Sequence, residues 1–359
     1  MNKIIKSIIL MGGILALFSC NNQIKKQSLI DEKEKKVVAK QDTIKQFKRL
    51  RFYELKGIDP KAVHIVKIYG QKELNGFLEL CPTFPYLEEL SLNVEMTEDV
   101  FDTLMDKLKD KLYFKELTID RCSLKKIPST IAKLQHLEVF TSFRNPLTEI
   151  SPEIGLMKNL RKLSLDPVIG NELKVIPSEI GQLENLETFI LSRSKVEILP
   201  AEIGNCKNLL QITINNSQLK SLPPEIGLCS QLRSLTLAFN EIESLPPEIG
   251  SLAELRGLSL AINELSELPI SIKNLKKLVS LDLTGNKFSV FPKEILSLNQ
   301  LSGLSIDQNE FKIFPVEIGD LINLKHLRVD RNLMDKHTIE VLKTKNRGVS
   351  INLIDRINK

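Results

Sequence analysis

The chain has 359 residues, with 50 Lys and Arg against 45 Asp and Glu, and its formal net charge is +5. Residues 1–20 carry +2 and residues 21–51 carry +6, which leaves −3 for residues 52–359. Nucleic-acid binding requires a basic stripe on the folded domain, so this charge distribution argues against a nucleic-acid partner.

The chain begins with the pattern of a secretory signal peptide. Lys3 and Lys6 form a basic start, and residues 8–18 form an apolar run that ends shortly before Cys20. This run is too short to cross a bilayer, which takes about 20 apolar residues. We interpret residues 1–19 as a signal peptide.

The end of this leader resembles a bacterial lipoprotein signal, in which a small residue precedes the cysteine that becomes lipidated. Leu17, Ser19 and Cys20 match that pattern, whereas Phe18 is bulkier than the usual residue. The resemblance implies lipid attachment at Cys20; the alternative is an ordinary signal peptide with an incidental cysteine. Asn21 stands where an Asp commonly retains lipoproteins in the inner membrane. We therefore expect a lipid-anchored protein of the bacterial cell envelope, at the outer membrane, either periplasmic or surface-exposed.

Residues 20–51 are interpreted as the lipidated N-terminus and a basic tether. The net charge of residues 21–51 is typical of a solvated spacer. Attraction to anionic lipid headgroups, at about 1 kcal/mol per basic residue near the surface, is the alternative.

A pattern of about 23 residues recurs along most of the remaining chain. Its best copies read L-x-x-L-x-L-x-x-N-x-L-x-x-L-P-x-E-I-G, and their prolines are evenly spaced at Pro177, Pro200, Pro223, Pro246, Pro269, Pro292 and Pro315. This resembles the leucine-rich repeat proteins and predicts a horseshoe-shaped solenoid of the α/β type. We expect a parallel concave β-sheet and a convex side of loops, 3-10 turns and short helices. About twelve repeats are predicted over residues 63–343, beginning at Val63, Leu87, Phe114, Leu137, Leu160, Leu186, Leu209, Leu232, Leu255, Leu278, Leu301 and Leu324.

Each consensus residue has a physical role. The leucines of L-x-L point inward from a short strand because successive strand residues face opposite sides. The asparagine is expected to bind unpaired backbone groups of the turning chain; Cys122, Ser194 and Ser217 replace it in three repeats. The proline ends the strand, and the Ile and Leu of E-I-G-x-L point inward from the convex side.

The ends of a solenoid need caps. We assign residues 52–62 to an N-terminal cap and residues 344–359 to a C-terminal cap. The run from Glu98 to Leu112 predicts a helix, residues 335–345 predict a closing helix, and residues 349–354 predict a last edge segment.

The sequence contains no motif of a known catalytic or metal site, and the four histidines lack metal-ligand spacing. We expect no enzyme activity, no cofactor and no metal. Cys206 and Cys229 lie one repeat apart at inward positions, so they should be neighbours in the core. Two buried thiols or a disulfide both fit that spacing, and a Cys81–Cys122 pair stays open as well.

The concave face is the usual binding surface of a solenoid. Phe239 and Ile262 occupy the same position in successive repeats, so we predict that they are adjacent and exposed, as candidate contact residues. The predicted partner-binding residues are Phe143, Arg144, Ile190, Arg193, Phe239, Ile262, Asp282, Asp307, Arg328 and Arg331.

These observations predict a non-enzymatic, monomeric binding domain that holds a protein partner through its concave face. A carbohydrate or cell-wall recognition module is one alternative; it usually shows aromatic residues, and this chain has no Trp and four Tyr. The E-I-G repeats also resemble intracellular Ras-associated leucine-rich repeat proteins, which implies a signalling adaptor. An export signal argues against that alternative.

Overall fold

A computed structural model describes residues 49–51, 58–166, 172–334, 340 and 350–352. The chain divides into two units, Met1–Phe47 and Lys48–Lys359, and the described residues all belong to the second. The predicted signal peptide, Cys20 and residues 20–48 of the predicted tether lie outside the described residues. Among the described residues, no helix is both long enough and apolar enough to cross a membrane.

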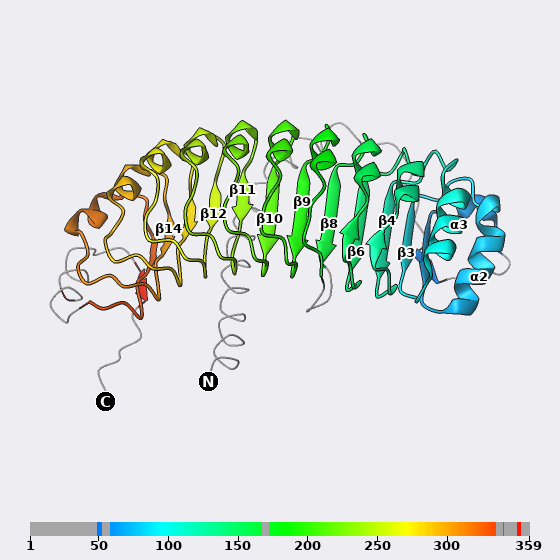
Figure 1. Ribbon diagram of the computed structural model, residues 1–359, viewed down its shortest axis with the longest axis horizontal. Coiled ribbons are helices and arrows are strands. Elements are labelled where there is room, and N and C mark those ends of the chain that lie inside the picture. The colour runs from blue at the N-terminus through cyan, green and yellow to red at the C-terminus, as the bar shows by residue number, and fades with distance from the viewer. Residues whose placement is uncertain (1–48, 52–57, 167–171, 335–339, 341–349, 353–359) are drawn as a thin grey trace, which may run out of the picture. The chain divides into compact units, whose positions relative to one another are not determined.

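The second unit is built on one parallel sheet of fourteen strands (Figure 1). Twelve of these strands, β2 to β15 without β5 and β7, coincide with the twelve predicted repeats. The strands are β1 (Arg49–Arg51), β2 (Ile65–Ile68), β3 (Glu89–Leu92), β4 (Glu116–Asp120), β6 (Val139–Phe143), β8 (Lys162–Asp166), β9 (Thr188–Ser192), β10 (Gln211–Asn215), β11 (Ser234–Thr236), β12 (Gly257–Ser259), β13 (Ser280–Asp282), β14 (Gly303–Ser305), β15 (His326–Arg328) and β16 (Ser350–Asn352). A second sheet pairs β5 (Lys126–Ile127) with β7 (Glu149–Ile150).

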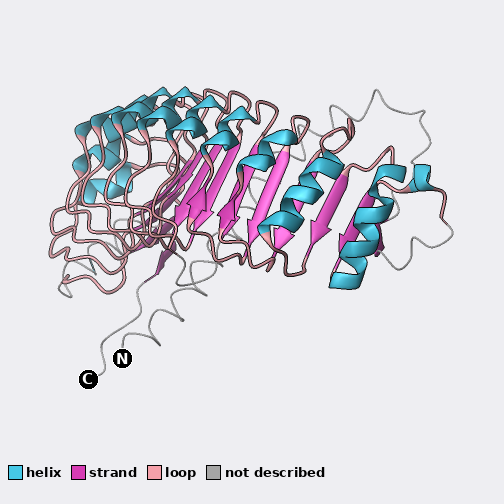
Figure 2. Ribbon diagram, turned by 45° about the vertical axis from the view of Figure 1, so that its right-hand side comes forward, coloured by secondary structure: helices cyan, strands magenta, loops and turns pink. Residues whose placement is uncertain are grey.

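Helical turns lie opposite the sheet and connect successive strands, as Figure 2 shows. Of the helices whose residues are all described, two are α-helices, α2 (Gln71–Leu80) and α3 (Glu98–Leu108). The others are 3-10 helices: η2 (Pro60–Ala62), η3 (Cys81–Thr83), η4 (Ser129–Lys133), η5 (Pro152–Leu156), η6 (Ser178–Gln182), η7 (Ala201–Asn205), η8 (Pro224–Leu228), η9 (Pro247–Ser251), η10 (Ile270–Asn274), η11 (Lys293–Ser297) and η12 (Val316–Asp320). Pro200 precedes η7 with φ −64°, the angle that its ring imposes.

The two ends differ in how well they were predicted. Strand β1 pairs with β2, so the predicted tether boundary at residue 51 was wrong: Arg49–Arg51 already belong to the sheet. At the other end β16 pairs with β15, within the predicted edge segment. The helix predicted from Glu98 to Leu112 is α3, which ends at Leu108 and whose buried face includes Phe101 and Leu104. The predicted closing helix falls almost entirely outside the described residues.

The core follows directly from the repeat. Ile212, Leu235, Leu258 and Leu281 are paired in register across β10 to β13, and all are buried. Each repeat therefore covers one flank of the apolar residues of the next. Burial of such a side chain contributes about 1.5–3 kcal/mol, so stability is shared between neighbouring repeats.

The asparagines bind the backbone between repeats, as predicted. Nδ2 of the buried Asn263 donates to the carbonyls of Leu237 (2.9 Å) and Leu260 (3.0 Å), and its Oδ1 accepts from the backbone N–H of Ile242 (3.0 Å). One amide thus satisfies polar groups of two successive repeats.

Where the asparagine is replaced, the contacts are fewer. The hydroxyls of Ser194 and Ser217 bind each other at 2.8 Å. The thiol of Cys122 donates to the carbonyl of Leu92 at 3.6 Å, while its backbone N–H donates to Oδ1 of Asn145. A neutral hydrogen bond contributes about 0.5–1.5 kcal/mol, so these repeats are joined less strongly.

The four cysteines in the described residues are free and buried. The thiols of Cys206 and Cys229 each donate to a backbone carbonyl of the preceding repeat, at Ile180 (3.2 Å) and Ile203 (3.5 Å). Burial raises the pKa of Cys206 to about 12 and that of Cys229 to about 11. The sequence left open either two thiols or a disulfide at Cys206 and Cys229, and the structure has two thiols.

The glycine of E-I-G permits close contact between repeats. A Cβ on Gly250 would lie 2.4 Å from the carbonyl oxygen of Ser271 in the next repeat, which is closer than a carbon can approach. Gly257 in β12 differs, because a Cβ there would meet no atom within 4 Å.

These two glycines make a matched pair of variants. We expect Gly250→Ala to lower the free energy of unfolding by about 1–3 kcal/mol, since the backbones must move apart. Gly257→Ala should leave it unchanged or raise it by about 0.4–1 kcal/mol, because the unfolded chain loses freedom. Urea unfolding followed by circular dichroism measures both, and equal effects would contradict the packing role of Gly250.

Candidate functional site

The strands line the inner face of the second unit, and the 3-10 helices line its outer face (Figures 1 and 2). Between β11 and β14 the side chains on the inner face are small except for Asp282 of β13. The small residues are Ser234, Thr236, Gly257, Ser259, Ser280, Gly303 and Ser305. Because a Cβ at Gly257 or Gly303 would meet no backbone, packing does not require glycine at either position.

A row of left-handed residues borders this inner face. Each is the residue before the asparagine position, where the chain turns away from its strand, and we name this set the corner row. Its members with positive φ are Arg121, Arg144, Arg193, Asn216, Phe239, Ile262, Gly285, Gln308 and Arg331.

Hydrogen bonds between repeats hold these corners. The backbone N–H of Phe239 donates to the carbonyl of Ala261 (2.8 Å), and that of Ile262 donates to Thr284 (2.7 Å). Only Gly enters this region without strain, and a β-branched residue such as Ile262 is rare there. The corner conformation is therefore imposed by the stacking of repeats and not by the local sequence.

Phe239 and Ile262 lie at adjacent corners, as predicted, but both are half-buried and the expectation that they are exposed was wrong. The side chain of Ile262 covers the next corner: its Cδ1 lies 2.4 Å from the position that a Cβ on Gly285 would take. At this point the side chain of one corner fills the space beside the next corner.

Four predicted residues gather between β6 and β9. Phe143 ends β6 and is exposed, while Ile190 lies in β9 and is half-exposed. Nε of Arg144 binds Asp120 at 2.8 Å, and Arg193 binds Asp166 at 3.0 Å.

The Asp166 carboxyl at this end is partly buried. Burial raises its pKa, and the charges of Arg193 and Arg144 oppose that rise. Both arginines are thus held by carboxylates of the preceding repeats, and each keeps a partly exposed guanidinium.

The remaining four predicted residues gather around β13 to β15. Nε of Arg328 binds Oδ2 of Asp307 at 2.9 Å, and Oδ1 of Asp307 accepts from the backbone N–H of Asp330 at 2.9 Å. Asp307 is only 4% exposed, so it positions Arg328 and does not present a contact surface. That corrects its predicted role as a partner contact.

Asp282 and Arg331 complete this group. The carboxylate of Asp282 accepts from the backbone N–H of Thr284 at 3.0 Å, and burial raises its pKa. Nε of Arg331 lies 3.5 Å from Oδ2 of Asp330. Arg328 and Arg331 are therefore the accessible charges of this end.

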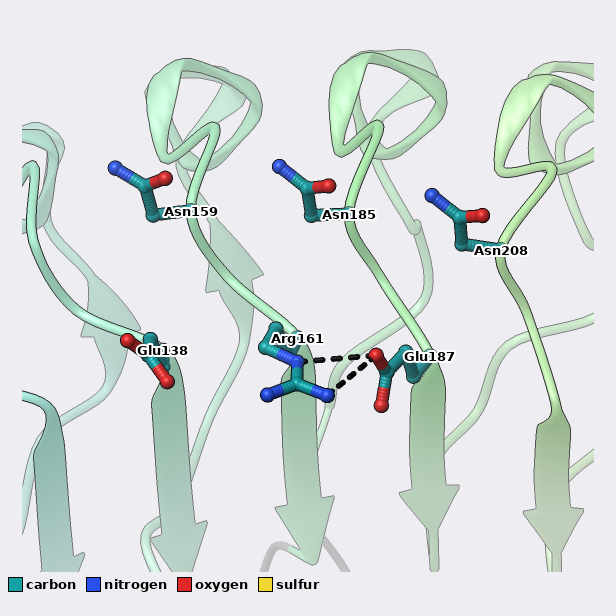
Figure 3. A pocket seen from close by; sticks show the side chains of 6 residues that line it. All are labelled: Glu138, Asn159, Arg161, Asn185, Glu187 and Asn208. Atoms are coloured by element: carbon teal, nitrogen blue, oxygen red, sulfur yellow. Dashed lines mark hydrogen bonds and ion pairs between the residues drawn. The ribbon is translucent and has the colours of Figure 1, made fainter.

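A polar pocket of about 170 Å³ lies where the chain enters β8, β9 and β10, away from the corner row. It is lined by Glu138, Asn159, Arg161, Asn185, Glu187 and Asn208, as Figure 3 shows. The sequence analysis did not identify this pocket. A signal was present, because each of its three asparagines lies three positions before a strand residue, and these strand residues, Lys162, Thr188 and Gln211, are paired in register.

Two exposed tyrosines were also missed as a group. The rings of Tyr86 and Tyr113 lie 5.4 Å apart edge to face, and Tyr86 stacks on His64 at 6.1 Å. Nδ1 of His64 in turn lies 2.8 Å from a carboxylate oxygen of Glu88. Tyr86 and Tyr113 lie before β3 and β4, and His64 directly precedes β2.

Comparison with known proteins agrees with this architecture. Residues 247–345 match the family model described as a leucine-rich repeat region. The volume-regulated anion channel subunit LRRC8A of Rattus norvegicus is 31% identical over 156 residues. That alignment covers 44% of this chain and only 17% of the channel subunit.

Two solved structures have the same fold. An internalin (inlF) from Listeria monocytogenes has a TM-score of 0.61 and 20% identity, over 77% of this chain and 83% of its own. The plant peptide hormone receptor RGFR1, in complex with RGF2, has a TM-score of 0.57 and 25% identity, over 85% of this chain and 54% of its own. The predicted solenoid of about twelve leucine-rich repeats is confirmed, and such repeats are typical of protein-interaction modules.

The buried carboxyl of Asp307 leads to a pH prediction. Burial raises its pKa to about 6, from about 3.9 in an unfolded chain. The folded state therefore binds this proton more tightly, so the stability contribution is complete below pH 4 and is lost as the pH rises towards 6. We expect the unfolding free energy of the wild type, relative to Asp307→Asn, to fall by about 2–3 kcal/mol across this window. Urea unfolding at several pH values measures it, and parallel profiles would contradict it.

Proposed function

We propose that this leucine-rich repeat solenoid is a non-enzymatic, lipid-anchored receptor that holds a protein partner against its inner face. The observation that carries this proposal is the corner row, where large side chains occupy a backbone conformation that favours Gly or Asn. A left-handed residue other than Gly costs roughly 1–2 kcal/mol.

Strain of this kind is informative because the fold does not need the side chains that bear it. Asn216 and Gly285 occupy the same corners at lower cost, yet Phe239 and Ile262 stand between them. Strained residues concentrate at sites of binding and catalysis. We attribute the retained strain to contact with a partner.

The chemistry along the inner face suits a polypeptide. Three groups follow one another along the sheet. The first is the ion-paired arginines Arg144 and Arg193, the second is the apolar pair Phe239 and Ile262, and the third is the exposed guanidinium of Arg328. Twelve strands at about 4.8 Å extend over roughly 50 Å, which is long enough for an extended segment or a protein surface. The small side chains of β11, β12 and β14 would let a partner backbone approach closely.

The similar proteins support a binding function, but they do not indicate which partner this chain binds. RGFR1 is a peptide hormone receptor whose structure contains RGF2, and it shares this chain's fold. The relation to a channel subunit concerns only a small part of that protein, so channel activity is not proposed.

We place the receptor in the bacterial cell envelope, anchored through lipid on Cys20 and carried on a basic tether. The leader pattern supports this location. A single acyl chain binds membranes only marginally, so a second acyl chain or a basic segment must strengthen the attachment. The eight Lys of residues 21–48 can supply the basic segment.

Replacement of Phe239 and Ile262 by Asp tests the proposed partner surface. Asp tolerates left-handed backbone, so we expect the double variant to fold with an unchanged circular dichroism spectrum. Capture of the partner from solubilised envelope, measured by quantitative mass spectrometry against wild type, should fall tenfold or more, as for a central contact.

Val290 and Ile313 supply the matched control. They are an exposed apolar pair, also one repeat apart, outside the corner row. Val290→Asp with Ile313→Asp should leave capture unchanged. Equal losses in both double variants, or capture that survives at Phe239→Asp and Ile262→Asp, would exclude the corner row as the site.

Cys20→Ser tests the anchor. We expect the wild type to incorporate labelled palmitate and to sediment with membranes, whereas the variant should lose the label and become soluble after export, since no other anchor is proposed. Cys81→Ser is the control for a cysteine in the repeats. Labelling that persists in Cys20→Ser would contradict lipid attachment there.

A further inference from the structure

One row of side chains runs along the flank where the chain enters the strands. Its members lie three residues before strand residues that are paired in register from β3 to β10. We name this set the flank strip: Tyr86, Tyr113, His136, Asn159, Asn185 and Asn208. Six neighbouring strands at about 4.8 Å give it a length of roughly 24 Å.

The amides of the flank strip are held in fixed orientation. Nδ2 of Asn159 donates to the carbonyl of Gln135 (2.8 Å), that of Asn185 to Lys158 (2.9 Å) and that of Asn208 to Glu184 (2.9 Å). An amide nitrogen has two hydrogens, so each side chain retains a second donor beside its carbonyl oxygen, which in Asn208 also accepts from Nε2 of Gln231 at 3.3 Å. All three asparagines are exposed.

Charged groups form the lower wall of the pocket beneath these amides (Figure 3). Arg161 donates to Oε1 of Glu187 from Nε (3.0 Å) and from its terminal nitrogen (2.7 Å). Lys115 binds Glu138 at 2.7 Å. Because these charges are already paired, the wall offers hydrogen-bonding atoms without a strong attraction for a free ion.

The aromatic end of the strip offers a different surface. Tyr86 is 39% exposed and Tyr113 is 51% exposed, and their rings support each other in an edge-to-face pair. A tyrosine combines an apolar ring with a polar hydroxyl. It can therefore pack on C–H groups of a ligand and also bind a hydroxyl.

We propose that the flank strip binds a neutral oligosaccharide. Sugar hydroxyls act as donor and acceptor at once, and the paired donor and acceptor of each amide match them. The pocket volume of about 170 Å³ corresponds to roughly five or six water molecules, which is space for one sugar ring at the amides. Further rings would extend along the strip towards the tyrosines, whose faces suit the C–H side of a pyranose.

Full-length protein tests this proposal, in a detergent without a sugar headgroup. The probes are cellohexaose, chitohexaose, xylohexaose, mannohexaose and maltohexaose, and the readouts are saturation-transfer NMR and calorimetry. We expect at least one of these hexasaccharides to bind. The double variant Asn159→Ala with Asn185→Ala should weaken that binding tenfold or more, at threefold to tenfold for each neutral hydrogen-bonding group removed.

The chain provides close controls. Nδ2 of Asn323 donates to the carbonyl of Asn299 at 2.7 Å in the same way, beyond the strip, so Asn323→Ala should retain wild-type affinity. Tyr113→Ala should lower affinity at least threefold, and Tyr113→Phe should keep most of it, since the ring remains. Failure of all five sugars to bind at millimolar concentration, or affinity unchanged in the asparagine double variant, would overturn the proposal. Phe239→Asp with Ile262→Asp should leave sugar binding intact, which separates this test from that of the inner face.

Discussion

The rest of the structure depends on the buried asparagine that connects successive repeats. Where the chain leaves a strand, its backbone groups turn into the core, and a buried group left without a hydrogen bond costs about 1–3 kcal/mol. The amide of Asn263 satisfies two carbonyls and one N–H at this place. By fixing each strand end against the next, these amides keep the strands in register and therefore align side chains of equal repeat position into rows.

The same constraint gives the corner row its properties. The residue before each asparagine is held left-handed by hydrogen bonds to the neighbouring repeat. Its backbone is thus fixed before any partner arrives, and its side chain has few ways to rearrange. A preorganised surface loses less entropy on binding, so the strain at Phe239 and Ile262 is compatible with tight contact.

Much of this could be predicted from the sequence, because the period of the repeat specifies register, and register specifies which residues share a row. The twelve repeat strands and the role of Asn240 and its equivalents follow from that period. Burial within a row could not be predicted from it. Asp307 is buried and forms an ion pair with Arg328 of the next repeat, and Arg49–Arg51 form a strand although Leu50 was counted with the tether and not with the repeats.

The flank strip shows the same limit more sharply, since its residues occupy a variable position that a repeat consensus treats as solvent-facing. Asn159, Asn185 and Asn208 line one pocket only because the stacking of the repeats places them side by side above Arg161 and Glu187. A solenoid repeats every position as a row, so it presents several parallel surfaces at once. The inner face and the flank arise from different positions of one repeat, and substitutions can alter one without altering the core that both share. Such a scaffold can therefore hold two chemically different ligands without a second domain.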